Sequence, residues 1–341
     1  MDPDWHGSAL PLNRRQRRSI ERSKTLVIYA FSGPDQKDWM QVESKGVTVL
    51  CLDLLLGHNL LDSDLCGWIE SLIETRGVDA WLLSPPCRTT SACRHRDDGG
   101  PVPLRGCGDH RFGLPGLKPS DQEKTDSDSI LWLKSLYWMW LSHQKNPKTK
   151  YLLENPRDPN EWHPSGNHPE EGSVLGAHGG AFKSEDDLRF PSFWQWPESE
   201  IVRKAIGLTK VHVEQGAMGH PTVKPTTLMS NFQDVIDLQG LKCDHALVMK
   251  HHQWPSDVEE RVKFSKTLAA WAPGLKELLA KSLIKLHLEG PSKICRLTPA
   301  EVEEIRQWEE HVARGHCPYR RDCAVCVETR GRDRKPLVRT T

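Results

Sequence analysis

The sequence predicts an α/β protein built on a parallel sheet with helices on both faces. Short apolar runs rich in β-branched residues recur along the first half of the chain. Continuous apolar runs of this length are typical of strands that are buried on both faces. Segments with apolar residues at helical spacing lie between these runs, and alternation of strands with helices is typical of parallel sheets.

Four strands are expected, and each ends in a polar or glycine-containing turn. They are Thr25–Ala30, followed by Phe31-Ser32-Gly33-Pro34; Val47–Leu52, followed by Asp53; Val78–Leu83, followed by Ser84-Pro85-Pro86-Cys87; and Tyr151–Leu153, followed by Glu154-Asn155-Pro156. Two amphipathic helices are expected between them, at Asp62–Arg76 and Ser127–His143. Residues 88–126 and 156–200 are rich in Gly, Pro, His and charged residues, which predicts long functional loops.

The second half of the chain returns to helix. Ser256 and Glu259 form a capping-box pattern at the start of a helical region, residues 256–288, which Pro273-Gly274 is expected to break in two. Thr298-Pro299-Ala300-Glu301 has the sequence of another helix start. The predicted organisation is a basic arm (1–24), an α/β domain (25–250), a helical extension (251–290) and a helix with a Cys/His segment and basic tail (291–341).

The charge of the 341-residue chain is zero overall but uneven along its length. Lys+Arg and Asp+Glu are both 46. Residues 1–24 carry six basic and three acidic residues (+3) and residues 311–341 eight and three (+5), so the middle carries −8. Basic ends favour contact with nucleic acid, DNA in particular, although solvated tails would have the same composition. The basic segment at 13–24 fits a nuclear-import signal, a phosphate-binding arm or a linker.

Several classes of protein are excluded by composition. The sequence holds no apolar stretch of eighteen residues, so we expect no membrane span. The N-terminus lacks the layout of a secretory signal, and ten cysteines are too few for a disulfide scaffold of this length. The expected location is therefore nuclear or cytoplasmic, with cysteines that are reduced, metal-bound or catalytic.

The residues that end the four strands form an ordered set. Ligands of parallel sheets bind beyond the carboxyl ends of the strands, where a glycine lets backbone approach a cofactor and an acidic residue accepts from a ribose hydroxyl. In chain order the set is Phe31-Ser32-Gly33, Asp53, Pro86-Cys87 and Glu154-Asn155, with Ser91 four residues after the cysteine. This order and placement resemble the C5-cytosine DNA methyltransferase family, whose sheet is a Rossmann-like, S-adenosylmethionine methyltransferase-type sheet.

The resemblance implies a role for each of these residues. Phe31, Ser32, Gly33 and Asp53 would hold S-adenosylmethionine, Cys87 would be the nucleophile, Glu154 would contact the cytosine and Asn155 would position the site. Ser91 and Lys224, the latter in the segment 219–225, would contact DNA. A cysteine thiolate that attacks C6 of cytosine activates C5 toward a methyl group, and a base must leave the duplex to reach such a site. Arg88 stands where the family usually has glutamine.

A Cys/His cluster lies near the C-terminus. His311-x4-His316-x6-Cys323-x2-Cys326 offers four ligands, and two residues between cysteines let both thiolates reach one tetrahedral zinc ion. The alternative is a reduced cysteine pair beside surface histidines. The run from His311 to Cys326 resembles the His/Cys segment that precedes the integrase core of retrotransposon polyproteins, which implies zinc, DNA binding, DNA integration and a downstream integrase with other polyprotein regions.

Three functions remain open at this point. The first is a fragment of a retrotransposon polyprotein with a DNA cytosine-C5 methyltransferase-like domain and a pre-integrase zinc segment. The second is a catalytically degenerate module that binds nucleic acid. The third is a structural spacer of a polyprotein.

Overall fold

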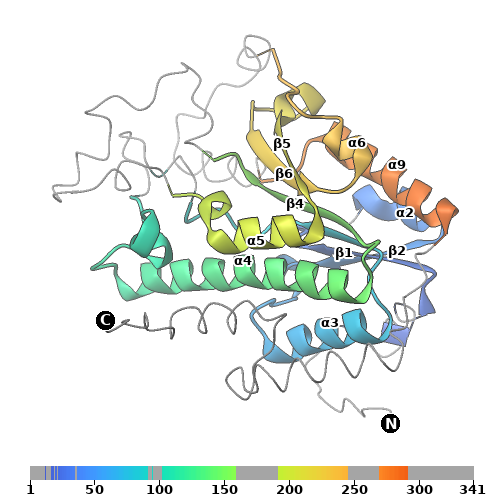
Figure 1. The fold of residues 1–341 in the computed structure, drawn as a ribbon, viewed down its shortest axis with the longest axis horizontal. Helices are drawn as coiled ribbons and strands as arrows, with labels where there is room; N and C mark the ends of the chain where they lie inside the picture. Colours follow the sequence, from blue (N-terminus) through green and yellow to red (C-terminus); the bar gives the residue numbers. More distant parts are fainter. Residues whose placement is uncertain are drawn as a thin grey trace, which may run out of the picture. The chain divides into compact units, whose positions relative to one another are not determined.

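Six strands form one mixed sheet in the order β2-β1-β3-β4-β6-β5 (Figure 1). The computed structural model describes residues 12, 17–18, 20, 22–34, 37–90, 94, 102–158, 191–244 and 269–290. All of these belong to a first unit, residues 1–294, and a second unit, residues 295–341, lies outside them.

The elements follow one another as the alternation of patterns predicts. The strands are β1 (Thr25–Ala30), β2 (Val47–Leu52), β3 (Ala80–Leu83), β4 (Lys150–Pro156), β5 (Thr209–Glu214) and β6 (Pro225–Ser230). The α-helices are α2 (Met40–Glu43), α3 (Ser63–Thr75), α4 (Pro119–Lys145), α5 (Pro197–Ile206), α6 (Gln233–Ile236) and α9 (Pro273–Glu289). Short 3-10 helices are η1 (Lys37–Trp39), η2 (Leu54–Leu56), η4 (Gly108–Phe112), η7 (Phe193–Gln195) and η8 (Gln215–Met218).

Strand β1 lies at the centre of the parallel part of the sheet. It pairs in parallel with β2 on one side and with β3 on the other, and β3 pairs in parallel with β4. All six residues of β1 are buried, with Val27 and Tyr29 in one core and Ile28 and Ala30 in the other. The prediction of strands buried on both faces is therefore confirmed.

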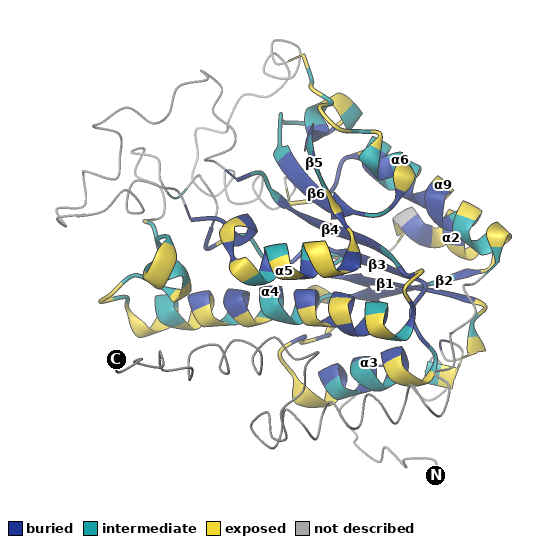
Figure 2. Ribbon diagram, viewed as in Figure 1, coloured by how far each residue is buried: buried dark blue, intermediate teal, exposed yellow. Residues whose placement is uncertain are grey.

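Two helical layers cover the sheet (Figures 1 and 2). Helices α3, α4 and α5 pack on one face, where Trp81, Trp132 and Trp138 are fully buried. Helices α2, α6 and α9 cover the other face, and Leu275, Leu279 and Leu283 of α9 are completely buried there. Among the helices of the described ranges, none is long and apolar enough to cross a membrane.

The far end of the sheet departs from the expected parallel arrangement. Strand β6 runs antiparallel to both β4 and β5, so the sheet is mixed. The sequence analysis did not predict these two strands. Alternation of polar with apolar residues in β5 is itself a strand pattern, which was missed, whereas the buried side chains of β6 include Thr226, Thr227 and Ser230. Hydroxyl-rich strands lack the apolar run by which β1 and β2 were found.

Several predicted boundaries differ from those of the structure. Helix α4 begins at Pro119, eight residues before the expected start, and η4 also lies within the expected loop 88–126. Strand β4 continues to Pro156, so Glu154 and Asn155 lie in the strand and pair with β6. The expected loop 156–200 contains η7 and the start of α5. Pro273 is the first residue of α9, which agrees with the expected break, and residues 256–268 before it lie outside the described ranges.

Candidate active site

The order of the strands reverses beside β1, and some of the predicted site residues lie at this reversal. The chain goes from β1 to β2 on one side, and then crosses back to β3 on the other side of β1. In doubly wound sheets, the crevice outside the carboxyl ends of the strands at such a switch point is where ligands bind. The turn at 31–33 and the segment at 84–90 leave the two strands that border it.

The turn after β1 has an unusual backbone. The backbone N–H of Phe31 donates to the carbonyl oxygen of Leu52 at 2.7 Å, which holds the turn against the end of β2. Phe31 has a φ of 63°, and Lys224 with 40° is the other non-glycine residue with positive φ in the described ranges. Such conformations strain a residue that has a Cβ, and they concentrate at functional sites. Both residues were predicted to belong to the site.

Gly33 and Asp53 are in direct contact. Gly33 has a φ of 72°, and open space lies beside it where a Cβ would stand. Its N–H donates to Asp53 Oδ2 at 2.9 Å, and Asp53 Oδ1 accepts from the N–H of Leu55 at 2.8 Å, which caps η2. A carboxylate offers about four acceptor positions, so Asp53 retains capacity for further donors.

Cys87 lies in a turn after β3 that is held by hydrogen bonds to residues of β1 and β4. The backbone N–H of Ser84 donates to the carbonyl of Ala30 at 3.3 Å, which keeps the end of β3 beside β1. The Asn155 side-chain amide donates to the carbonyl of Pro85 at 3.0 Å. The Cys87 carbonyl accepts from the N–H of Thr90 at 3.0 Å, and the Cys87 residue is half-buried. Asn155 thus holds the backbone two residues before Cys87, and a role in positioning the site for catalysis stays a prediction.

Glu154 is a buried carboxylate with defined donors. It is 4% exposed, and its Oε2 accepts from the Ser84 hydroxyl at 2.6 Å. Its Oε1 accepts from Gln215 Nε2 at 3.4 Å and lies 3.9 Å from Lys224 Nζ. A buried carboxylate is stable only when it is paired or hydrogen-bonded, and these groups meet that need. Through Ser84, Glu154 is held at the strand end that also carries Cys87.

Gln215 is a site residue that the sequence analysis missed. It is fully buried, and its amide nitrogen also donates to Thr226 Oγ1 at 2.9 Å. Its amide oxygen accepts from the backbone N–H of Ala272 at 2.8 Å, directly before α9. Gln215 therefore connects Glu154 to the start of the last described helix. A single glutamine after an unpredicted strand gives no pattern by which the sequence could reveal it.

Lys224 lies next to Glu154. Its ammonium donates to the carbonyls of Ala269 and Ala270 at 3.1 and 2.8 Å, and its side chain is 16% exposed. The structure thus brings Lys224 to the same edge as Cys87. Its contact with a DNA phosphate stays a prediction.

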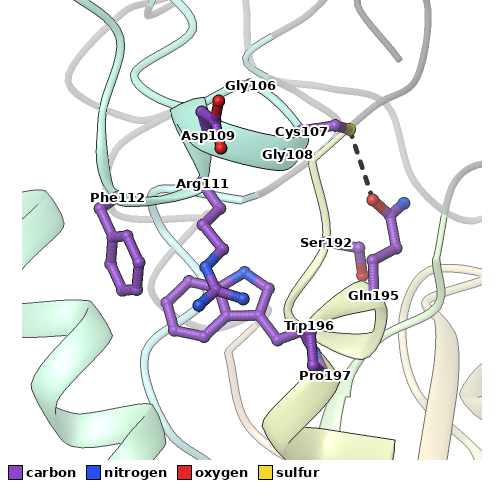
Figure 3. Close-up of a pocket in the computed structure, with 10 residues that line it drawn as sticks. All are labelled: Gly106, Cys107, Gly108, Asp109, Arg111, Phe112, Ser192, Gln195, Trp196 and Pro197. Carbon is purple, nitrogen blue, oxygen red and sulfur yellow. Dashed lines mark hydrogen bonds between the residues drawn. The ribbon is translucent and has the colours of Figure 1, made fainter. Parts of the chain in front are cut away.

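A cavity of about 470 Å³ lies on this edge but contains none of the predicted residues (Figure 3). It lies between η4 and η7, where the Arg111 guanidinium stacks over the rings of Phe112 and Trp196 at 4.7 and 5.3 Å. Cys107 Sγ donates to Gln195 Oε1 at 3.4 Å, and Gln195 Nε2 donates to Asp158 beyond β4. The cavity is a feature separate from the candidate site.

Five of the predicted residues lie outside the described ranges. They are Ser91 and the four zinc ligands His311, His316, Cys323 and Cys326. Within those ranges, no group of three or more His, Cys, Asp or Glu side chains is placed to hold a metal ion.

Comparisons with models of known families, with curated proteins and with solved structures gave no match.

Proposed function

We propose that residues 25–250 form a DNA cytosine-C5 methyltransferase-like domain with Cys87 as its nucleophile. The observation that carries this proposal is the connection between the ends of β3 and β4. Ser84 binds Glu154, and Asn155 binds the carbonyl of Pro85, so that a cysteine turn and a buried glutamate share one strand edge. A nucleophile and an acid placed together at a switch point fit covalent chemistry on a bound base.

The pattern of the sheet supports a Rossmann-like assignment of this domain. The section β2-β1-β3-β4 is parallel, with helices on both faces and a reversal of order beside β1. The predicted cofactor residues lie on the turns that follow β1 and β2, on one side of the reversal. The predicted catalytic residues follow β3 or end β4, and both of these strands lie on the other side of the reversal.

The turn residues fit S-adenosylmethionine. Gly33 leaves open space beside its backbone, and Asp53 has acceptor capacity for a ribose hydroxyl beyond the two N–H groups that it binds. Phe31, Ser32, Gly33 and Asp53 would hold the cofactor. When bound, the cofactor supplies an electrophilic methyl group.

The chemistry of the chain itself belongs to Cys87 and Glu154. The Cys87 thiolate forms a bond to C6 of cytosine, and the electron pair of the C5–C6 double bond makes C5 nucleophilic. Glu154 would take up a proton when the base binds and donate a hydrogen bond from it to the ring nitrogen as charge develops there. After C5 is substituted, a water molecule takes its proton, the electron pair of the C5–H bond restores the C5–C6 double bond, and the C6–S bond breaks to restore the thiolate of Cys87.

DNA that contains 5-fluorocytosine tests this proposal. Fluorine blocks the loss of the C5 proton, so the full chain with S-adenosylmethionine should form a covalent adduct that peptide mass spectrometry maps to Cys87. Cys87→Ser should abolish the adduct. Cys107→Ser, which changes a half-buried thiol of the separate cavity, should retain it. No adduct in the wild type, or an adduct that survives in Cys87→Ser, contradicts the assignment.

A second candidate function is a module that binds nucleic acid without catalysis. One observation favours it: both oxygens of Asp53 already accept backbone N–H groups, which gives this carboxylate a structural role without a cofactor. This candidate predicts that wild type and Cys87→Ser bind DNA equally and that neither forms an adduct.

For residues 291–341 we propose a zinc-binding segment of the kind that precedes an integrase core, which would make the chain part of a retrotransposon polyprotein. The proposal is supported by the spacing of His311, His316, Cys323 and Cys326. DNA, and a downstream integrase region, are the partners that this reading implies. A nuclear location would follow from the same function.

A further inference from the structure

The residue directly after Cys87 is an arginine that is held by a buried carboxylate. Arg88 Nε donates to Asp128 Oδ1 at 3.0 Å, which joins the cysteine turn to helix α4. The Asp128 side chain has no exposed surface, whereas that of Arg88 is 56% exposed. Asp128 therefore holds the Nε side of the Arg88 guanidinium, while much of the arginine side chain faces solvent.

Asp128 belongs to a buried network of hydrogen bonds beneath the Cys87 turn. Its Oδ2 accepts from the Thr89 hydroxyl at 2.8 Å, and that hydroxyl accepts from Arg105 Nε at 2.9 Å. Arg105 is 1% exposed and also donates to the hydroxyl of Ser129 at 2.9 Å. The network has one carboxylate and two guanidinium groups, Arg105 within it and Arg88 at its surface.

Burial shifts the pKa of both charged groups in the buried network. Burial lowers the pKa of Arg105 to about 10, which still leaves it protonated. Burial raises the pKa of Asp128, and the nearby Arg88, Thr89 and Arg105 oppose that shift. Arg88 pairs with Asp128 next to Cys87, while 56% of its side chain stays exposed to solvent.

A second arginine supports the same turn. Arg94 Nε donates to the carbonyl of Arg88, and Arg94 Nη1 donates to the carbonyl of Val102 at 2.8 Å. The Arg94 guanidinium thus supports the backbone of Arg88 in the segment that follows β3. Arginine is suited to phosphate because its planar fork can donate two parallel hydrogen bonds.

We propose that Arg88 binds a phosphodiester group of DNA beside Cys87, and that Asp128 is a positioning residue that holds Arg88 through Nε and leaves its two Nη groups for the phosphate. The inference rests on the proposed function, since it assumes that DNA is the substrate at this edge. A backbone contact here would fix the register of the strand whose base reaches Cys87.

The salt dependence of DNA binding measures this contact. Binding of the full chain to a short DNA duplex is followed by fluorescence anisotropy across a series of salt concentrations. Each phosphate contact contributes about 0.9 to the slope of log K against log salt. Arg88→Gln should make the slope less steep by about that amount and weaken binding equally for unrelated DNA sequences. Lys281→Gln, an exposed lysine paired with Glu277 on α9, should leave the slope unchanged.

Arg88→Lys separates positioning from charge. Lysine has a single ammonium, which Asp128 would hold, so this variant should resemble Arg88→Gln rather than the wild type. A wild-type slope in Arg88→Lys would show that Asp128 does not position the contact, and a wild-type slope in Arg88→Gln would remove Arg88 from the interface. Wild-type protein that shows no salt-dependent binding would overturn the proposal outright.

The outcomes also separate this inference from the proposed catalysis. An Arg88-dependent slope without a 5-fluorocytosine adduct would retain the phosphate contact and reject the methyltransferase chemistry. An adduct at Cys87 with an unchanged slope in Arg88→Gln would retain the methyltransferase chemistry and reject the phosphate contact.

Discussion

The Ser84 hydroxyl donates a 2.6 Å hydrogen bond to Glu154 Oε2 and thereby joins the ends of two neighbouring parallel strands. The register places Leu83 beside Leu153, so the two residues that follow stand opposite each other. The strand pairing alone brings the cysteine segment near the glutamate, and the hydrogen bond fixes the orientation of the carboxylate. The chemistry proposed for this edge depends on that orientation.

Ser84→Ala should destabilise the protein by more than the loss of an ordinary surface hydrogen bond. A hydrogen bond to a charged group contributes about 1.5–3 kcal/mol, and the substitution leaves a buried carboxylate short of a donor. Urea denaturation measures the free energy of unfolding. Ser44→Ala, which removes an exposed hydroxyl bonded to the Gln41 carbonyl, should change it by less than about 0.5 kcal/mol. Equal effects of the two substitutions would show that Ser84 does not support Glu154.

Asp53→Ala should weaken the binding of S-adenosylmethionine, measured by calorimetric titration, because it removes the acceptor for the ribose. A hydrogen bond to a carboxylate is worth about 1.5–3 kcal/mol, or roughly tenfold to a hundredfold in affinity. Asp62→Ala is a matched control, since Asp62 also caps a helix by accepting from two backbone N–H groups but lies at the start of α3. Wild-type protein without saturable binding at millimolar cofactor would count against the enzyme and favour the non-catalytic module.

The elements found from sequence are those whose burial is apolar. Strand β1 and helix α3 were predicted almost to the residue, because their buried positions are apolar side chains, with Thr25 at the start of β1 as the exception. The start of α4 was missed because its buried face there consists of Thr125, Asp128 and Ser129. These residues serve Arg105 rather than an apolar core, so the helical period of hydrophobicity is absent.

The residues of the candidate site also fall into those that the sequence predicts and those that it does not. Cys87, Glu154 and Asn155 follow or end apolar strands, and their position in the sequence was enough to place them together. Gln215 and Asp128 act through long-range contacts, with partners 61 and 40 residues away in the chain. No local pattern encodes such contacts, since they depend on the packing of β5 and α4 against the strand ends.

Cys243 should be alkylated slowly at neutral pH. Burial, and then the nearby Glu214 carboxylate, raise the pKa of this thiol from 9.0 to about 11. Its rate of reaction with iodoacetamide, followed by peptide mass spectrometry, should therefore keep rising through pH 10. Because the folded-state pKa is raised, the corresponding stability is present below the unfolded-state value and is lost as pH rises through the window from about 9 to 11.

Glu214→Gln removes the negative charge 3.4 Å from the thiol and should lower the pKa of Cys243, with faster alkylation at pH 8. Glu200→Gln on α5, whose carboxylate pairs with Arg203, should leave the rate unchanged. If alkylation of Cys243 already levels off near pH 9 in the wild type, Glu214 does not act on this thiol.

The full chain should contain one zinc ion, bound by His311, His316, Cys323 and Cys326. Elemental analysis of the purified protein measures the metal content, and Cys323→Ser with Cys326→Ser should remove it. Cys107→Ser with Cys243→Ser changes two thiols that belong to no metal-binding group in the described part of the chain and should retain it. Binding needs thiolates and neutral imidazoles, so the affinity for zinc should fall steeply as pH is lowered. A content well below one per wild-type chain would exclude the site.

Zinc should also strengthen the binding of DNA. Arg320 and Arg321 lie between the predicted ligands His316 and Cys323, so a metal that orders this loop would hold both guanidinium groups in place for phosphates. A chelator should therefore weaken DNA binding and make its salt slope less steep, and Cys323→Ser with Cys326→Ser should do the same without chelator. The contact proposed for Arg88 should persist under both conditions, since it belongs to the α/β domain. DNA affinity that does not respond to the chelator would leave zinc a structural role and remove its role in binding.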